Sequence, residues 1–203
     1  MRSFSRFLTA CALVALSALS LQASTTTEQV LAAVTKIGGT FEVDAEMPGH
    51  PVVKIDLHGT SVTDDDLAIL EDLKDLRFLD LRLTKIGDKG VAHLRGLTKV
   101  RFLNLFRTQV GDGGLKQLKN LAELETLLVG GTKVTDKGLE NVKAFAHLRK
   151  LSLFDTQVGD AGLDSLKGMR SLEVLLIGKS KVTEEGTRAI QVALPNLRFT
   201  EPT

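Results

Sequence analysis

A small hydroxyl-bearing residue recurs every 24 residues along this chain. The repeated position holds Thr60, Thr84, Thr108, Thr132, Thr156 and, as a serine, Ser180. A fixed period in this range is the signature of a stacked-repeat architecture, in which each unit packs only against its neighbours. The repeat therefore constrains the fold more strongly than any local motif.

Six copies of the 24-residue unit fill residues 52–195, which is 144 of the 203 residues. In the second copy, Leu76, Leu79 and Leu81 follow the alternation of a strand. Further on, Val91, Leu94 and Leu97 are spaced by three and predict one face of a helix. Strand and helix therefore alternate, and a single unit cannot bury its apolar residues alone. Stacking solves this by forming a parallel sheet with helices on its opposite side, connected with the usual right-handed crossover.

The repeats are flanked by segments of different character. Residues 1–23 read as an export signal, with Arg2 and Arg6 before a largely apolar run of 15 residues and a small-residue cleavage site ending at Ala23. The run is shorter than the roughly 20 residues of a membrane-spanning helix, although an uncleaved anchor stays open as an alternative. Residues 24–51 are predicted to form an amino-terminal cap, and residues 196–203 a carboxy-terminal cap or tail.

The repeat pattern resembles a known family. Residues 124–142 follow L-x-x-L-x-L-x-x-T-x-V-T-D-x-G-L-x-x-L. This is similar to leucine-rich repeats, specifically the cysteine-containing subtype of F-box-type and ribonuclease-inhibitor-like proteins, with threonine in place of cysteine. The resemblance, taken with the export signal, implies a secreted bacterial protein with an α/β solenoid. Its curved parallel sheet would line the concave face, its helices would cover the convex face, and it would serve as a binding scaffold.

Composition argues against several other functions. The chain has 26 basic and 25 acidic residues, which gives no bulk attraction to nucleic acid or to an anionic membrane. Cys11 is the only cysteine, and the four histidines share no metal-ligand spacing. No catalytic constellation is present, so we expect no enzyme activity, metal or cofactor.

Three further columns of the repeat have structural explanations. We interpret the aspartates as caps of the helices that follow them, and the threonines as partners of backbone groups. The glycines are expected to allow close approach between stacked turns. The columns are Asp64, Asp88, Asp112, Asp136 and Asp160; the threonines given above; and Gly90, Gly114, Gly138, Gly162 and Gly186.

The strand residues that point away from the core suggest a binding surface. Four of the nine phenylalanines fall on this face, and a contiguous apolar patch on a soluble protein usually marks a contact site. Gly130 lies between two phenylalanine-bearing strands and is expected to leave a gap for a partner's side chain. The candidate protein-binding residues are Phe78, Arg82, Phe102, Phe106, Leu128, Gly130, Phe154 and Leu176.

Two alternatives stay open. Copies three and five match at 13 of 24 positions, whereas copies three and four match at 8, so duplication of a two-repeat unit also explains the alternation of phenylalanine and glycine. In function, the favoured prediction is a monomeric, secreted or periplasmic scaffold that binds a protein partner. A structural spacer of the cell envelope, or a self-associating repeat protein, is the alternative.

Overall fold

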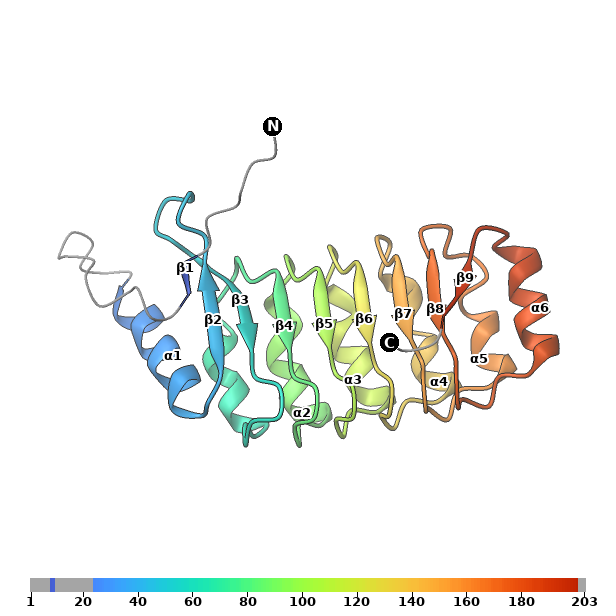
Figure 1. Cartoon of the computed structure of the whole chain (residues 1–203), viewed down its shortest axis with the longest axis horizontal. Coiled ribbons are helices and arrows are strands. Elements are labelled where there is room, and N and C mark those ends of the chain that lie inside the picture. Colours follow the sequence, from blue (N-terminus) through green and yellow to red (C-terminus); the bar gives the residue numbers. More distant parts are fainter. Residues whose placement is uncertain (1–7, 10–23, 201–203) are drawn as a thin grey trace.

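The computed structural model describes residues 8–9 and 24–200. Its strands form one nine-stranded sheet whose spatial order follows the chain (Figure 1). The predicted export signal falls outside the described residues, apart from the two that form β1. The strands are β1 (Leu8–Thr9), β2 (Thr40–Val43), β3 (Val52–Asp56), β4 (Phe78–Asp80), β5 (Phe102–Asn104), β6 (Thr126–Leu128), β7 (Lys150–Ser152), β8 (Val174–Leu176) and β9 (Arg198–Phe199).

The sheet register reproduces the 24-residue period. From β3 to β9 neighbouring strands are parallel, and each residue pairs with the one 24 positions later, as Leu79 does with Leu103. At the amino-terminal end, β2 is antiparallel to both β3 and β1. Equivalent residues of successive repeats therefore stand in straight rows across the sheet.

The helices are short, and many are of the 3-10 type. A 3-10 helix has three residues per turn, so apolar residues spaced by three stay on one face. This explains the burial of Val91, Leu94 and Leu97, the row whose spacing predicted a helix. The helices are α1 (Ser24–Lys36), η2 (Asp65–Leu70), α2 (Asp88–Val91), η3 (Ala92–Gly96), α3 (Asp112–Gln117), η4 (Leu118–Asn120), α4 (Asp136–Leu139), η5 (Val142–Ala144), α5 (Asp160–Asp164) and α6 (Glu184–Ala193).

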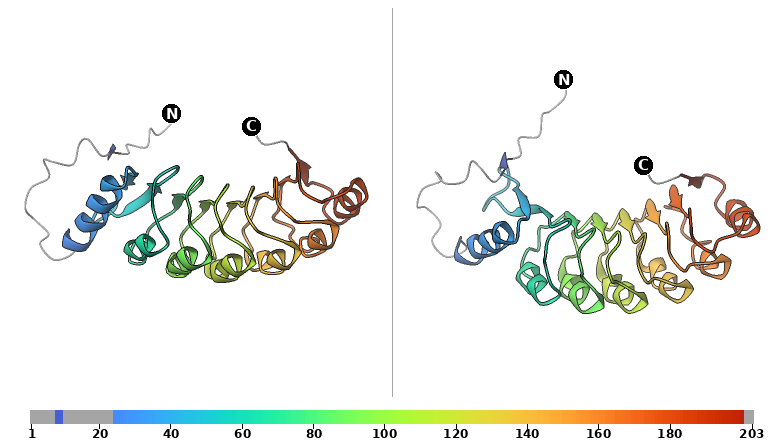
Figure 2. Two further views of the ribbon diagram at one scale, coloured as in Figure 1. Left: turned by 90° about the horizontal axis from the view of Figure 1, so that it is seen from below. Right: turned by 60° about the horizontal axis from the view of Figure 1, so that its bottom comes forward.

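The molecule is an arc, with the sheet on its inner side and the helices on its outer side (Figure 2). Paired strands lie about 4.8 Å apart, whereas packed helices need about 8–10 Å, so the stack bends toward the sheet. One continuous apolar core lies between the two layers and runs from Val30 in α1 to Leu197 beside β9. The solenoid is therefore a rigid platform that presents one sheet face.

The aspartate column corrects our prediction of helix capping within each repeat. The residues before α2, α3 and α5 are Gly87, Gly111 and Gly159, and none of these three helices has a side-chain cap. Each aspartate instead accepts a hydrogen bond from the next repeat, as Asp136 does from the Gly159 N–H at 2.7 Å. The same bond recurs for Asp64, Asp88, Asp112 and Asp160. The carboxylate thus lies at the amino end of the neighbouring helix, where the helix dipole favours negative charge.

The last bond of this aspartate ladder is reinforced by a side chain. The Thr183 hydroxyl donates to Asp160 at 2.6 Å, and the Thr183 N–H donates at 2.8 Å. Both hydrogen bonds favour the charged carboxylate and hold the pKa of Asp160 below its ordinary value. The bond from the hydroxyl has the larger effect, and the bond from the N–H the smaller. The ladder therefore continues to α6, where the repeat sequence departs most from the pattern.

The threonine and glycine columns behave as predicted. Each threonine hydroxyl donates to the carbonyl oxygen three residues earlier, as Thr132 does to Val129 at 2.6 Å. Each glycine lies against the aspartate of the preceding repeat. A Cβ on Gly138 would lie 2.5 Å from Oδ1 of Asp112. The glycines are therefore required by the ladder, since a side chain there would displace the carboxylate.

Candidate functional site

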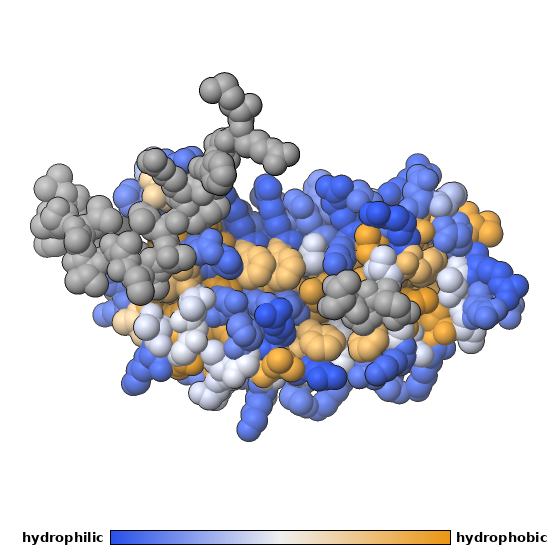
Figure 3. Space-filling view, viewed as in Figure 1, coloured by the Kyte–Doolittle hydropathy of each residue, from blue (hydrophilic) through white to orange (hydrophobic). Residues whose placement is uncertain are grey.

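The face of the sheet that no helix covers carries three rows of side chains. The first row is Lys54, Phe78, Phe102, Thr126, Lys150, Val174 and Arg198. The middle row is Asp56, Asp80, Asn104, Leu128, Ser152 and Leu176. The third row, just after the strands, is His58, Arg82, Phe106, Gly130, Phe154 and Gly178. Apolar side chains gather over the middle strands of this face, between hydrophilic borders (Figure 3).

Phe78 and Phe102 form a stacked pair in the first row. Their ring centroids are 4.2 Å apart and their planes differ by 2°. The stack follows from the register, because these two residues are direct partners on adjacent parallel strands. The Lys54 ammonium lies over the Phe78 ring, 5.1 Å from its centroid. Stacking and the cation–π contact thus fix the rings in a defined orientation.

The middle row is more deeply buried than the alternation predicted. Asp80 is 3% exposed, and Asn104 and Ser152 are similarly covered by the flanking rows. Leu176, one of the predicted contact residues, is only 6% exposed, so it offers little surface to a partner. The narrow concave face shelters the middle of each strand, and Leu128 in the central repeat stays half-buried.

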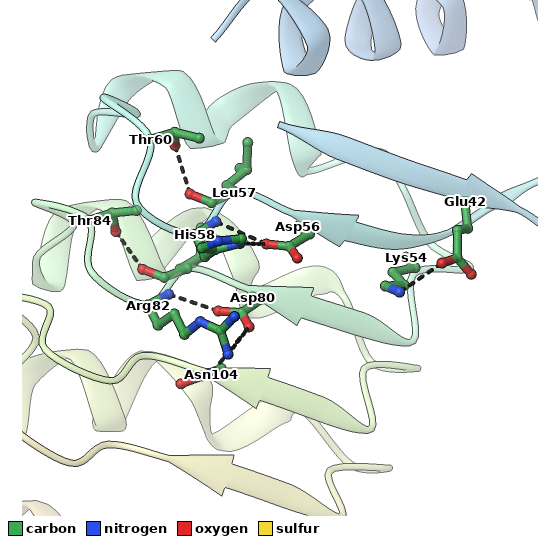
Figure 4. Close-up of polar contacts among 11 residues, drawn as sticks. Glu42, Lys54, Asp56, Leu57, His58, Thr60, Asp80, Arg82, Thr84 and Asn104 are labelled. Carbon is green, nitrogen blue, oxygen red and sulfur yellow. Dashed lines mark hydrogen bonds and ion pairs between the residues drawn. The ribbon is translucent and has the colours of Figure 1, made fainter. Parts of the chain in front are cut away.

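The carboxylates in the amino-terminal half of this face all have partners (Figure 4). Asp80 accepts from the Asn104 amide at 3.2 Å and lies 3.5 Å from the Arg82 guanidinium. Glu42 pairs with Lys54 at 2.7 Å. The predicted contact residue Arg82 is therefore turned toward a buried carboxylate, which reduces its availability to a partner.

Asp56 and His58 form a third such pair. Nδ1 of His58 lies 2.8 Å from Oδ1 of Asp56, and the His58 backbone N–H donates to the same oxygen. Burial raises the pKa of Asp56, but the backbone bond and then the side-chain bond from His58 outweigh it, so the net shift is downward. The carboxylate is therefore held in its charged form beside His58.

Gly130 does not leave the open gap that the sequence suggested. A Cβ at this position would lie 2.9 Å from the Phe154 carbonyl oxygen and 3.0 Å from Cδ2 of Phe106. The Phe106 ring has folded over the glycine, so the space is already filled. Gly130 is thus buried, and its role is to let the aromatic ring lie close to the backbone. Phe106 and Phe154 themselves are half-buried and present their outer surfaces to solvent.

A fourth row, missed by the sequence interpretation, lies where the strands turn into loops. We call it the turn row: Gly59, Leu83, Arg107, Gly131, Asp155 and Lys179. All six residues have positive φ, with Leu83 at 60°, although the left-handed region favours glycine. Leu83 is also 51% exposed. Leu83 therefore places one exposed apolar side chain beside the third row of the open face. The available signal was an apolar side chain in a column that holds glycine in two other repeats.

Two shallow hollows lie away from the sheet face, one beside α6 around Thr187 and one on the convex side around Met169. Within residues 8–9 and 24–200, no cluster of three potential metal ligands occurs. In that same part of the chain, no helix has the length and apolar character needed to cross a membrane.

Comparisons with known proteins agree with the fold. A leucine-rich repeat family model matches residues 73–94, 96–119 and 146–167. Among solved structures, an internalin (InlF) of Listeria monocytogenes aligns with a TM-score of 0.56 and 17% identity over 86% of this chain. This chain spans 54% of that internalin chain, about half its length. No curated protein matches. The predicted α/β leucine-rich repeat solenoid is thus confirmed, and such solenoids typically bind partners through their concave surface.

Proposed function

We propose that this leucine-rich repeat protein is an exported scaffold that binds a protein partner on its concave sheet face. The main support for the proposal is the set of aromatic and aliphatic side chains that remain solvent-accessible on the sheet face that no helix covers. Phe78, Phe102, Phe106 and Phe154 are half-buried, and Leu83 projects from the turn row. Aromatic anchors fixed on a rigid sheet are the usual energetic centre of a protein interface.

The finer features of the proposal come from the sequence. The repeats are assigned to the cysteine-containing subtype, with the buried threonine hydroxyl in the cysteine position. Export rests on residues 1–23, with cleavage after Ala23, and places the mature protein in the periplasm or outside the cell. Amino-terminal sequencing of protein recovered from the cell envelope should begin at Ser24; a chain that retains Arg2 and Arg6 would contradict cleavage.

Replacement of two aromatic anchors tests the binding face. We expect Phe102→Ser with Phe154→Ser to weaken capture of the envelope partner at least tenfold, because hot-spot truncations cost about 2 kcal/mol or more. Capture on immobilised mature protein, followed by titration of the purified partner, provides the measurement. The matched control is Lys143→Ser with His147→Ser, two exposed positions on the convex side.

The outcome separates binding from a structural role. A partner that binds the double phenylalanine variant and the control equally would contradict the proposed face. Light scattering of the mature protein should give a monomer at every concentration. A discrete oligomer that the phenylalanine replacements dissociate would instead establish self-association through the same face.

Leu83→Asn should separate binding from stability. Asparagine tolerates the left-handed conformation better than leucine, and relief of roughly 1 kcal/mol offsets the loss of the contacts that the exposed leucine side chain still makes. We therefore expect the free energy of unfolding to change by less than about 0.5 kcal/mol. Partner affinity should fall severalfold, as measured by titration alongside urea unfolding. Unchanged affinity would remove Leu83 from the interface.

A further inference from the structure

Resting on the proposed function, we infer that the partner presents an acidic segment with interspersed apolar side chains, and that this segment lies on the carboxy-terminal half of the sheet face, strands β5 to β9. The two halves of the face differ in how their charged side chains are paired.

The amino-terminal half is electrostatically self-contained. Its three carboxylates, Glu42, Asp56 and Asp80, have Lys54, His58 and Arg82 as partners at 2.7, 2.8 and 3.5 Å. With His58 counted as neutral, two positive and three negative charges give this group a formal charge of −1, which does not attract an acidic segment. The carboxylates also lie below the ends of their partners' side chains, with Asp80 almost fully covered. A charged partner would gain little here.

The carboxy-terminal half carries cations without such pairing. Arg107, Lys150, Lys179 and Arg198 lie in the first row and the turn row, and all four are exposed. Among the described residues, no carboxylate lies within ion-pair distance of any of them. The rows of this half contain one carboxylate, Asp155. Four positive charges and one negative charge give this half a formal charge of +3.

The cations are not a general feature of the sheet edges. At the edge where the strands begin, basic residues meet acidic ones from the neighbouring repeat, as Arg149 does with Glu173 at 2.7 Å and Arg101 with Glu125 at 3.8 Å. That edge is neutralised within the chain itself. Cations at the edge where the strands begin therefore have acidic partners in the chain, whereas the four cations on the carboxy-terminal half of the face have none among the described residues.

Two of the unpaired cations lie directly on the aromatic anchors. The Arg107 guanidinium is 5.2 Å from the Phe106 ring centroid, and the Lys179 ammonium is 5.4 Å from that of Phe154. Each cation–π contact holds a positive charge beside an apolar surface. Leu128 lies in the middle row between them. The complementary ligand therefore has carboxylates and apolar side chains close together.

This combination favours a protein segment over other polyanions. A polyphosphate or sulfated sugar would use the four cations but leave the phenylalanine rings and Leu128 without apolar contacts. The chain as a whole has a net charge of only +1, so it lacks the broad positive field that non-specific polyanion binding uses. A peptide that alternates acidic and apolar residues uses both features and can lie extended across neighbouring strands.

A random peptide library displayed on phage, selected on the immobilised mature protein, tests the chemistry of the bound segment directly. We expect selected peptides to be enriched in Asp or Glu together with Leu, Ile or Phe. Their Asn or Gln analogues should bind about tenfold more weakly at low salt, since the interaction adds several exposed ion pairs. Heparin and vesicles of anionic phospholipid serve as competitors.

Charge reversal at two of the cations tests where the selected peptides bind on the protein. Arg107→Glu with Lys179→Glu should raise the Kd of the acidic peptides at least about tenfold. The control, Lys116→Glu with Lys143→Glu, makes the same charge change at exposed convex positions and should leave Kd within about twofold. Thermal unfolding of both variants verifies that the solenoid is intact.

Each result bears on a separate claim. Selected peptides could lack acidic residues and yet fail to bind the Phe102→Ser, Phe154→Ser variant. That result would overturn the acidic character of the partner and leave the binding face in place. A library that yields no peptide sensitive to any sheet-face replacement would overturn both. Heparin could bind as tightly as the peptides, with an affinity that the phenylalanine replacements do not change. That result would assign the cations to a polyanion and overturn the proposal of a peptide partner.

Discussion

Gly162→Ala should lower the free energy of unfolding by about 2–3 kcal/mol, although it adds only one methyl group. The new Cβ would lie 2.5 Å from Oδ1 of Asp136, 2.9 Å from Cγ1 of Val158 and 3.2 Å from the Asp136 Cα. The carboxylate cannot stay in place and would lose its hydrogen bond to the Gly159 N–H. Rotation of the Asp136 side chain would not relieve the crowding, because the Asp136 Cα also lies close to the new Cβ. Urea unfolding followed by circular dichroism provides the measurement.

Gly168→Ala is the matched control for this substitution. Gly168 lies six residues away in the same repeat, and a Cβ there would meet nothing within 4 Å. The free energy of unfolding of the Gly168→Ala variant should stay within about 0.5 kcal/mol of that of the parent protein. Equal effects of the two substitutions would show that the aspartate ladder contributes nothing beyond ordinary glycine propensity.

This ladder shows why the fold could be predicted while one of its interactions could not. The 24-residue period gave the order, direction and register of the strands, because each repeat is one unit of a one-dimensional stack. The same period predicted which leucines are buried. It could not say which repeat donates the hydrogen bond that an aspartate accepts, since Asp136 begins its own helix in sequence but accepts from Gly159 of the next repeat. That choice depends on the close approach that glycine permits.

The candidate site was predictable in part. Two-residue alternation placed Phe78 and Phe102 on the open face, and the 24-residue spacing places their rings side by side, as the 4.2 Å stack shows. The same rule misjudged Leu176 and Gly130, because alternation gives the direction of a side chain and not the depth of cover above it. A neighbouring ring lies over Gly130. Leu83 was missed because its exposure arises from a left-handed turn and not from the strand.

The proposed binding face depends on the rigidity of this stack. The phenylalanines and cations are spread over several repeats, so their spacing is maintained only while neighbouring repeats remain packed. A core residue of the central repeat should therefore affect the whole face, whereas its equivalent near one end should act locally. Leu127 and Leu175 are such a pair, since both are fully buried strand residues two repeats apart.

Leu127→Ala should lower the free energy of global unfolding by about 3 kcal/mol, in the range for a buried leucine whose cavity cannot collapse. Leu127 lies in β6, between β5 and β7, so the cavity weakens the contacts of the central repeat with both neighbours. Leu175→Ala removes the same atoms from β8, which is followed by β9 at the end of the described sheet. Urea unfolding gives the global values, and hydrogen exchange shows where protection is lost.

The two variants should therefore differ in which elements lose protection from hydrogen exchange, as well as in how much their free energy of unfolding falls. Leu127→Ala should reduce protection from β5 to β7 and weaken peptide binding, because the repeats that carry Phe106 and Phe154 lie on either side of the cavity. Leu175→Ala should release α6 and β9 first and leave protection in β4 to β6 close to that of the parent protein. Identical losses would mean that the solenoid unfolds as a single unit. In that case the repeats could not be treated as separable neighbours, and local rigidity could not explain how the face keeps its shape.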